Sequence, residues 1–284
     1  MTTSVADLLE DATRKLRAAG IVKPRREANR LWAWMHRVSP GESWLTRERP
    51  APGDQARHFA DAVARRVRGE PLAYILGHTG FRRLEIRCDS RALIPRPETE
   101  GVIDLALALV RTGSALDLGT GTGCLALALA DEGEFQVTAV DNSEAALSLA
   151  AENVQATGLH VELIRSDLVA AVQGRVFDLI VSNPPYLSES EYDALDPSVK
   201  SWEPSAALVS GPSGLESARR ILTEAPAVLR PGGWLVMELD SARSALALQL
   251  AAALGWERLR VERDLYGRDR YLVAGRGVQT GGGG

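Results

Sequence analysis

Apolar residues recur every three or four positions through the first seventy residues, a spacing that is typical of amphipathic helices. Thr3 or Ser4 is suited to cap the first of these helices, and Gly20 is suited to end it. Pro24 suits the first turn of the second helix. The pattern therefore predicts a small helical domain over residues 1–75.

The spacing changes after this helical segment. Leu84, Ile86 and Cys88 alternate with charged residues, and this period of two predicts a strand with one exposed face. Glycines upstream of the strand indicate a turn. A hairpin connector is therefore expected over residues 76–95.

From residue 114 onward, predicted strands alternate with predicted helices, which favours a parallel sheet covered on both faces. The seven predicted strands are 115–118, 135–140, 161–164, 177–181, 234–239, 258–261 and 271–274. A turn at Pro231-Gly232-Gly233 is expected before the fifth strand. We therefore predict an α/β, Rossmann-like domain over residues 96–276, followed by a disordered glycine-rich tail at 277–284.

The composition is ordinary for a globular protein, with 45% apolar and 25% charged residues among 284. No apolar run is long enough to span a bilayer, and residues 1–7 lack the basic start and apolar core of a signal peptide. Cys88 and Cys124 are the only cysteines, and the four histidines are scattered. We therefore expect a cytoplasmic protein with no disulfide, no metal and no membrane partner.

Charge is distributed unevenly along the chain. Residues 1–70 carry 14 Lys and Arg against 9 Asp and Glu, a net charge of +5, whereas the remaining residues carry −9. A basic front on an acidic body favours an acidic protein partner over a nucleic-acid duplex. Surface solvation alone explains the same charges equally well.

The stretch Ser182-Asn183-Pro184-Pro185-Tyr186 follows a predicted strand, at the sheet edge where open α/β folds bind ligands. Its two prolines fix two φ angles and remove two donors, which gives a stiff arm. The Asn183 side-chain oxygen and the Pro184 carbonyl together can accept both hydrogens of a planar NH2 group. The Tyr186 ring can lie against that group. Taken alone, the same residues are also common in simple turns.

A glycine-rich loop joins the first strand of the sheet to the next helix, with the sequence Asp117-Leu118-Gly119-Thr120-Gly121-Thr122-Gly123. Glycines let a ligand approach the backbone closely, and a helix N-terminus offers free N–H groups. The spacing departs from the dinucleotide fingerprint because position 124 is Cys. The loop also has no basic residue for a pyrophosphate. A cofactor without phosphates, S-adenosylmethionine, fits it better.

Two acidic residues follow the next two strands. Asp141 lies 22 positions after Gly119, where an acidic side chain commonly binds ribose hydroxyls. Asp167 follows the third strand and is expected to accept a hydrogen bond from an adenine amino group. Either residue alone is more often a cap or turn residue, so the prediction depends on their joint placement at successive strand ends.

The chain resembles the release factor glutamine methyltransferases, which are protein-(glutamine-N5) methyltransferases that use S-adenosylmethionine. The similar stretches are residues 69–77, 93–100, 117–123, 183–186 and 264–270. The most family-specific of them is Leu93-Ile94-Pro95-Arg96-Pro97-Glu98-Thr99-Glu100. The resemblance implies a seven-stranded methyltransferase domain preceded by a helical substrate-docking domain.

The resemblance also implies the residues of the site. The cofactor is expected to contact Gly119, Thr120, Gly121, Thr122, Gly123, Asp141, Asp167, Leu168 and Asn183. The substrate glutamine is expected to be held by Asn183, Pro184, Pro185 and Tyr186, with Asn183, Pro184 and Tyr186 as the catalytic residues. The chain departs from the family at two places: Leu168, after the third strand, stands where an aromatic residue is frequent, and after the fifth strand Glu238-Leu239-Asp240 replaces Glu-Ile-Gly and a following Gln.

The implied substrate is the glutamine of the Gly-Gly-Gln motif of bacterial peptide chain release factors 1 and 2, methylated at N5 by a monomeric enzyme without direct nucleic-acid contact. A ribosomal-protein glutamine methyltransferase would have the same local chemistry and stays open as an alternative. A nucleic-acid amino methyltransferase would share the arm, but it would need a basic cleft that the acidic body argues against. The intact arm argues against a non-catalytic cofactor-binding protein.

Overall fold

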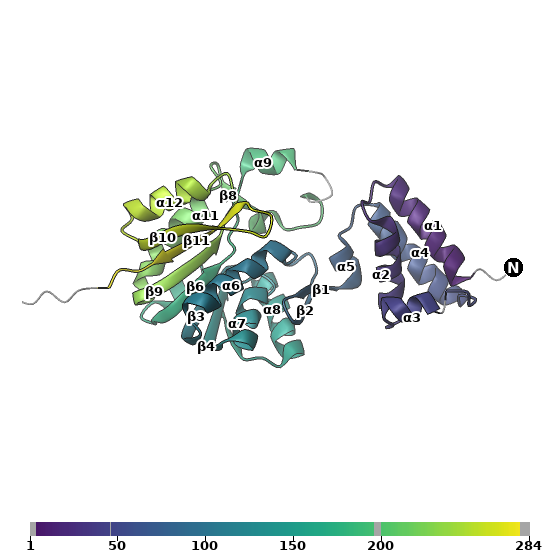
Figure 1. Ribbon diagram of the computed structural model, residues 1–284, viewed down its shortest axis with the longest axis horizontal. Helices are drawn as coiled ribbons and strands as arrows, with labels where there is room; N and C mark the ends of the chain where they lie inside the picture. The colour runs from purple at the N-terminus through teal and green to yellow at the C-terminus, as the bar shows by residue number, and fades with distance from the viewer. Residues whose placement is uncertain (1–3, 46, 196–199, 279–284) are drawn as a thin grey trace, which may run out of the picture. The chain divides into compact units, whose positions relative to one another are not determined.

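The computed structural model describes residues 4–45, 47–195 and 200–278. The chain divides into two compact units, Met1–Gly77 and His78–Gly284 (Figure 1). Most of the predicted tail, residues 279–284, lies outside the described residues.

The first unit is helical, as predicted, and its helices are α1 Val5–Ala18, α2 Pro24–Met35, α3 Pro40–Leu45, α4 Gly53–Val67 and α5 Leu72–Leu76. Ser4 caps α1, because its hydroxyl accepts the Asp7 N–H at 3.1 Å and the Asp7 carboxylate accepts the Ser4 N–H at 3.0 Å. Thr3, the other predicted cap, lies outside the described residues. The helices α3 and α5 were not predicted, because five or six residues are too few for a helical period to show.

The core of this unit comes from one stripe of each long helix. Leu16 of α1, Leu31 and Trp32 of α2 and Phe59 of α4 are buried together. The rings of Trp32 and Phe59 meet edge to face, with their centroids 5.2 Å apart. Aromatic pairs prefer this geometry, so Trp32 is a packing residue.

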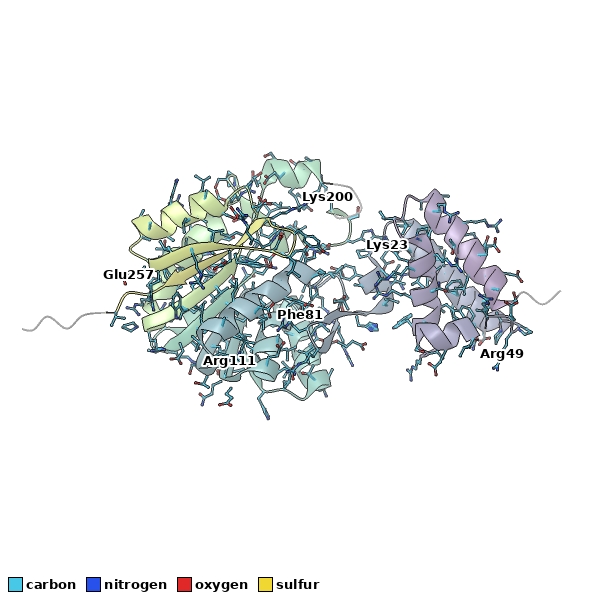
Figure 2. All side chains as sticks on the ribbon, viewed as in Figure 1. Lys23, Arg49, Phe81, Arg111, Lys200 and Glu257 are labelled. Atoms are coloured by element: carbon cyan, nitrogen blue, oxygen red, sulfur yellow. The ribbon has the colours of Figure 1, made fainter. Side chains whose placement is uncertain are left out.

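The second unit begins with the predicted hairpin, whose strands β1 His78–Phe81 and β2 Leu84–Arg87 pair antiparallel. The predicted alternation is confirmed, since Ile86 is buried while its neighbours in β2 are exposed. Phe81, labelled in Figure 2, is also buried. The side chain of Asn153 bonds the backbone N–H of Arg87 at 2.7 Å and its carbonyl at 3.2 Å. The hairpin is therefore built into the second unit, and the separate connector over 76–95 stays a prediction.

A seven-stranded sheet forms the centre of the second unit, in the order β10-β11-β9-β6-β3-β4-β5. The strands are β3 Thr112–Leu118, β4 Glu134–Asp141, β5 Val161–Arg165, β6 Phe177–Ser182, β9 Leu229–Glu238, β10 Glu257–Arg263 and β11 Asp269–Gly275. The five strands from β9 to β5 are parallel, and β11 runs antiparallel to both of its neighbours. The α/β fold and all seven predicted strands are confirmed.

The turn expected at Pro231-Gly232-Gly233 is wrong, because these residues belong to β9. The ladder between β9 and β6 is interrupted there, between the pairs Phe177↔Leu229 and Leu179↔Trp234, and the ladder between β9 and β11 begins at Trp234. On the other side, the Gly232 N–H donates to the Arg276 carbonyl at 3.0 Å. Gly232 has a φ of +79°, so the glycine supplies a bulge within the strand and not a turn before it.

Helices cover both faces of the sheet. The longer ones are α6 Glu100–Leu109, α7 Cys124–Glu132, α8 Glu144–Thr157, α11 Glu216–Glu224 and α12 Ser244–Ala253. Leu116 and Leu118 of β3 pack with residues of α11 and α12. Asp117, between them, bonds α7 on the opposite face, where α6 and α8 also lie (Figure 1). The alternation of side chains along β3 thus separates the two helical layers.

Short elements surround the carboxyl edge of the sheet. They are η1 Pro97–Thr99, η2 Ala170–Val172, β7 Leu187–Ser188, α9 Glu189–Ala194, η3 Ser205–Ala207 and β8 Val209–Gly211, whereas η4 Ala225–Ala227 lies at the amino edge, just before β9. Within the described residues, no helix is long and apolar enough to cross a membrane. The same residues contain no cluster of three His, Cys, Asp or Glu that could hold a metal ion.

Candidate active site

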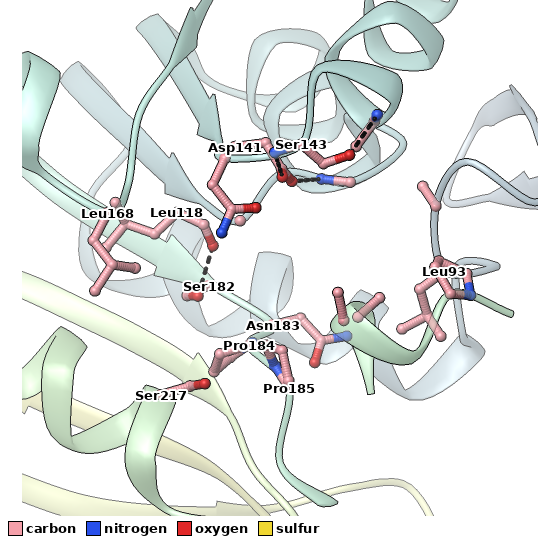
Figure 3. Close-up of a pocket in the computed structure, with 18 of the residues that line it drawn as sticks. Leu93, Leu118, Asp141, Ser143, Leu168, Ser182, Asn183, Pro184, Pro185 and Ser217 are labelled. Carbon is pink, nitrogen blue, oxygen red and sulfur yellow. Dashed lines mark hydrogen bonds between the residues drawn. The ribbon is translucent and has the colours of Figure 1, made fainter. Parts of the chain in front are cut away.

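A cavity of about 330 Å³ lies at the carboxyl ends of β3, β4 and β6 (Figure 3). This volume lies in the range of small-molecule sites, and its position is where parallel α/β sheets bind ligands. Its wall contains most of the sequence-predicted residues, namely Gly119, Gly121, Asp141, Asp167, Leu168, Asn183, Pro184 and Pro185. Parallel strand ends therefore bring together three motifs that are far apart in the sequence.

Gly119 and Gly121 of the glycine loop line this cavity, whereas Gly123, the third predicted glycine, does not. Gly119, Gly121 and Gly123 have φ angles of +73°, +56° and +84°, which residues with a Cβ adopt only at a cost. The N–H groups of Gly119 and Thr120 both donate to the Val140 carbonyl, at 2.9 and 3.0 Å. The glycines thus let the loop fold back tightly over the end of β4.

Thr120 and Thr122 of the predicted set are buried and do not line the cavity. The Thr120 hydroxyl donates to Oδ2 of Asp117 at 2.6 Å, and the Ala126 N–H donates to the same oxygen at 3.2 Å. Burial raises the pKa of Asp117 to about 7, against the opposing effect of these two hydrogen bonds. Asp117 therefore joins the loop, through Thr120, to the first turn of α7.

Asp141 is anchored by backbone groups on both oxygens. Its Oδ2 accepts the Gly121 N–H at 2.9 Å, and its Oδ1 accepts the Ser143 N–H at 2.9 Å (Figure 3). A carboxylate has about four acceptor sites, so each oxygen keeps capacity for a ligand hydroxyl. The carboxylate is thus held in place at the wall, in a form suited to bind a pair of hydroxyls.

Two arginines in the wall are held by carboxylates. Arg220 of α11 donates to both oxygens of Asp167, at 3.0 and 3.1 Å. Arg91 donates to Asp89 at 2.7 Å and to Glu152 at 2.6 Å. The positive charge of the wall is therefore locally balanced, which suits a ligand without phosphates. The Asp167 carboxylate, predicted as an adenine acceptor, is already bonded on both oxygens.

The arm from Asn183 to Tyr186 separates the main cavity from a second one of about 50 Å³. Asn183 and Pro184 line both cavities, whereas Tyr186 lines only the smaller one. Among the residues that the structure describes, neither Oδ1 of Asn183 nor the carbonyl of Pro184 accepts a hydrogen bond. The two acceptors that the sequence predicts thus stand available where the cavities meet.

The arm is fixed at its root and along its length. The Ser182 hydroxyl donates to the Leu118 carbonyl at 2.7 Å, which ties the arm to the start of the glycine loop (Figure 3). The Asn183 Nδ2 donates to the Thr99 hydroxyl at 3.1 Å. Burial raises the pKa of Tyr186, and the Glu238 carboxylate raises it further, so this ring stays neutral.

Sequence reasoning missed several residues around the arm. Arg96 donates to the buried Glu203 at 2.6 Å, which joins the stretch 93–100 to the chain segment that follows the arm. The resemblance drew attention to Arg96 and Thr99 within that stretch but gave neither a role. Nothing in the sequence distinguishes Glu203 or Arg220, because their partners lie far away along the chain.

Comparisons with known proteins agree with this geometry. A model of the family described as Methyltransferase small domain matches residues 102–197, and one described as PrmC N-terminal domain matches residues 7–77. The release factor glutamine methyltransferase of Cereibacter sphaeroides is 44% identical over 272 residues, covering 95% of this chain and 97% of that protein. The protein of the same name from Pseudomonas aeruginosa is 40% identical over 286 residues, covering 95% and 98%.

Among solved structures, a methyltransferase from Pyrococcus furiosus matches with a TM-score of 0.55 at 22% identity. The match covers 77% of this chain and all of the other. At this identity, the likeness concerns the fold alone.

Proposed function

The chain belongs to the release factor glutamine methyltransferase family, and from this premise we propose that it methylates release factors. The methyl group comes from S-adenosylmethionine. The acceptor is the side-chain nitrogen N5 of the glutamine in the Gly-Gly-Gln motif. The observation that carries this proposal is the pair of available acceptors, Asn183 Oδ1 and the Pro184 carbonyl, where the two cavities meet.

The wall of the main cavity fits S-adenosylmethionine. The anchored carboxylate of Asp141 suits ribose hydroxyls, and the glycine loop leaves its backbone open to close approach. Arg91 and Arg220 are paired with carboxylates, so the wall is not built for phosphates. When bound, this cofactor supplies an electrophilic methyl group on a sulfonium.

The residues of the arm act on the substrate nitrogen. An amide nitrogen is a weak nucleophile because its lone pair is shared with its carbonyl. Hydrogen bonds from its two N–H groups to Asn183 Oδ1 and the Pro184 carbonyl orient the nitrogen, and positioning supplies much of the reduction in barrier. The same acceptors stabilise the positive charge that develops on nitrogen during transfer. The proton leaves afterwards, when the nitrogen is far more acidic, so no strong base is required.

The smaller cavity suits the glutamine side chain. Pro184, Tyr186 and Leu93 give it an apolar wall with a flat ring for a planar amide, and the polar side chains of Arg96 and Asn183 also line it. A glycine-flanked glutamine has no neighbouring side chains to collide with this wall. The loop of a release factor is therefore a better candidate than a glutamine within regular structure.

The remaining expectations about partners belong to this proposal. The first unit docks the protein substrate through its positive charge. The substrates are release factors 1 and 2. The enzyme works in the cytoplasm as a monomer and needs no nucleic acid. Docking of this kind weakens with salt, because exposed charges are screened. The KM for a release factor is therefore expected to rise with ionic strength, while cofactor affinity changes little.

The direct test is methyl transfer to defined substrates. The enzyme is incubated with methyl-labelled S-adenosylmethionine and a release factor, its loop Gln→Glu variant, a ribosomal-protein mixture or duplex DNA, and products are located by peptide mass spectrometry. Label on the loop glutamine is the expected result. Label on the Gln→Glu variant, or on ribosomal protein or DNA in place of the release factor, would overturn the assignment.

A further inference from the structure

Glu238 is a buried carboxylate beside the arm, and the reaction described above makes no use of it. It ends β9 with 1% of its surface exposed, and its Oε2 has no hydrogen-bond partner among the described residues. The nearest cation, Nη1 of Arg270, lies 3.9 Å from Oε1. A buried charge without full pairing is costly, so its presence next to a catalytic arm calls for a role.

Thr99 connects Glu238 to the arm. Its hydroxyl accepts the Nδ2–H of Asn183 at 3.1 Å, and it lies close enough to the Glu238 carboxylate to oppose the rise of that group's pKa. Thr99 stands at the N-cap of α6, where a threonine usually bonds the first backbone N–H groups, yet its side chain makes no capping bond. The hydroxyl is thus directed away from its usual local partner and toward the site.

The direction of these bonds follows from the donors available. A threonine hydroxyl has a single hydrogen, and an ionised carboxylate can only accept. When the hydrogen of Thr99 points to Glu238, only lone pairs of the hydroxyl remain for Asn183. Asn183 must then present its NH2 group to Thr99, which leaves Oδ1 for the substrate amide.

The orientation of this amide matters because its oxygen and nitrogen have nearly the same shape. A rotated Asn183 would present an NH2 group to the NH2 group of the substrate, and no hydrogen bond could form. We propose that Glu238 and Thr99 are positioning residues that hold the Asn183 amide with its oxygen toward the substrate nitrogen. This inference rests on the proposed function and deepens it.

Substitutions at Thr99 test this chain of contacts from Glu238 through Thr99 to Asn183, which we call the relay. Thr99→Val keeps the shape and removes the hydroxyl, whereas Thr99→Ser keeps the hydroxyl. Assays at pH 8 keep Glu238 ionised, since burial raises its pKa to about 7. We expect Thr99→Val to lower kcat by roughly 10- to 100-fold, as for the loss of an oriented transition-state hydrogen bond. Thr99→Ser should stay within about threefold, and the cofactor Kd should stay within about threefold in both variants.

Thr138 provides a matched control. It is a buried threonine whose hydroxyl also donates to a carboxylate, Glu162 at 3.1 Å, and accepts from a side-chain N–H, Arg175 at 2.9 Å. It lies in β4 and lines neither cavity. Thr138→Val should therefore leave kcat within about twofold, because a buried hydroxyl is lost without any effect on Asn183.

Glu238→Gln extends the test to the far end of the relay. The glutamine can donate as well as accept, so the direction of the Thr99 hydrogen is no longer fixed, and kcat should fall by roughly three- to tenfold. If the effect passes through Thr99, the Thr99→Val/Glu238→Gln double variant is no slower than Thr99→Val alone. Losses that multiply, or a Thr99→Ser variant as slow as Thr99→Val, would overturn the proposal.

A measurement without the substrate separates this inference from the proposed function. The chain has asparagines only at positions 29, 142, 153 and 183, so asparagine labelled with nitrogen-15 gives few side-chain NMR signals, and Asn183→Ala assigns one of them. The Asn183 signal should keep its bonded shift and slow exchange in Thr99→Ser and lose both in Thr99→Val. An unchanged signal in Thr99→Val would refute the relay. If the variants give this pattern but the wild-type enzyme fails to methylate a release factor, the proposed function is refuted and the positioning of Asn183 is not.

Discussion

Two buried carboxylates lie near the carboxyl ends of β3 and β9, each beside a threonine hydroxyl, and they serve different purposes. Asp117 accepts a hydrogen bond from the hydroxyl of Thr120 in the glycine loop, whereas Glu238 lies beside the hydroxyl of Thr99, which we propose donates to it. In the described part of the chain, each keeps one oxygen without a partner. Burial raises the pKa of both to about 7.

The difference between them lies in what each threonine holds. Thr120 is part of the loop, and Asp117 also binds a backbone N–H of α7, so this carboxylate fixes main chain. Thr99 holds the side chain of Asn183, so Glu238 acts on a group proposed to touch the substrate. Loss of the first carboxylate should therefore appear in stability and cofactor binding, and loss of the second in turnover.

The largest effect is expected at the end of the Glu238 relay. Asn183→Ala removes one of two acceptors for the substrate amide, so kcat should fall by roughly 100-fold or more. The fold should be retained, because the side chain is only half-buried. Steady-state kinetics with a release factor, together with circular dichroism, measure both. Near-normal turnover in the folded variant would remove the arm from the mechanism.

Asp117→Asn should change how stability depends on pH. The folded state holds the Asp117 proton up to a pKa of about 7, above its usual 3.8, so the stabilising contribution is complete below pH 4 and is lost as the pH rises through 7. The side chain of the variant cannot ionise. Between pH 5 and pH 8 the free energy of unfolding should therefore fall by about 2–3 kcal/mol more in wild type than in the variant, since one proton contributes about 1.4 kcal/mol per pH unit.

Urea unfolding at pH 5 and pH 8 measures this difference, with the exposed Asp104→Asn as a control. Equal changes in wild type and Asp117→Asn would show that this carboxylate does not take up its proton in the folded state.

Asp141→Ala should separate binding from turnover. A hydrogen bond to a charged group is worth about 1.5–3 kcal/mol, so the cofactor Kd should rise by roughly 10- to 100-fold. At saturating cofactor, kcat should change less than in Asn183→Ala. Calorimetry measures the affinity. Asp104→Ala serves as the control, because Asp104 is an exposed carboxylate of α6 that is paired with Arg82. Unchanged affinity would exclude Asp141 from the site.

The smallest effect is expected at Arg220. Its ion pair with Asp167 is about half exposed, and exposed pairs contribute about 0.2–1 kcal/mol. Arg220→Ala should therefore alter the cofactor Kd by less than about fivefold, measured by the same calorimetry. A larger loss would show that Arg220 contacts the cofactor, and a large gain would show that it competes for Asp167.

The sequence by itself determined the layers of the fold. Alternating and helical periods are local, and burial of one face imposes them directly, which is why the long helices and all seven strands could be read without a structure. The glycine loop and the arm could also be predicted, because φ angles of glycine and proline depend on the residue itself. Pro231-Gly232-Gly233 shows the limit: the backbone was expected to turn, but pairing with Arg276 kept it in β9.

Only the tertiary structure decided which side chains act together. Thr99 and Asn183 are 84 residues apart, and Arg96 and Glu203 are 107 apart, so no local pattern could pair them. The same holds for Arg220, whose pairing with Asp167 requires α11 to pack beside the end of β5. Hydrogen bonds and ion pairs depend on distances of a few ångströms, and for residues distant in the chain those distances are set by how the sheet and its helices pack.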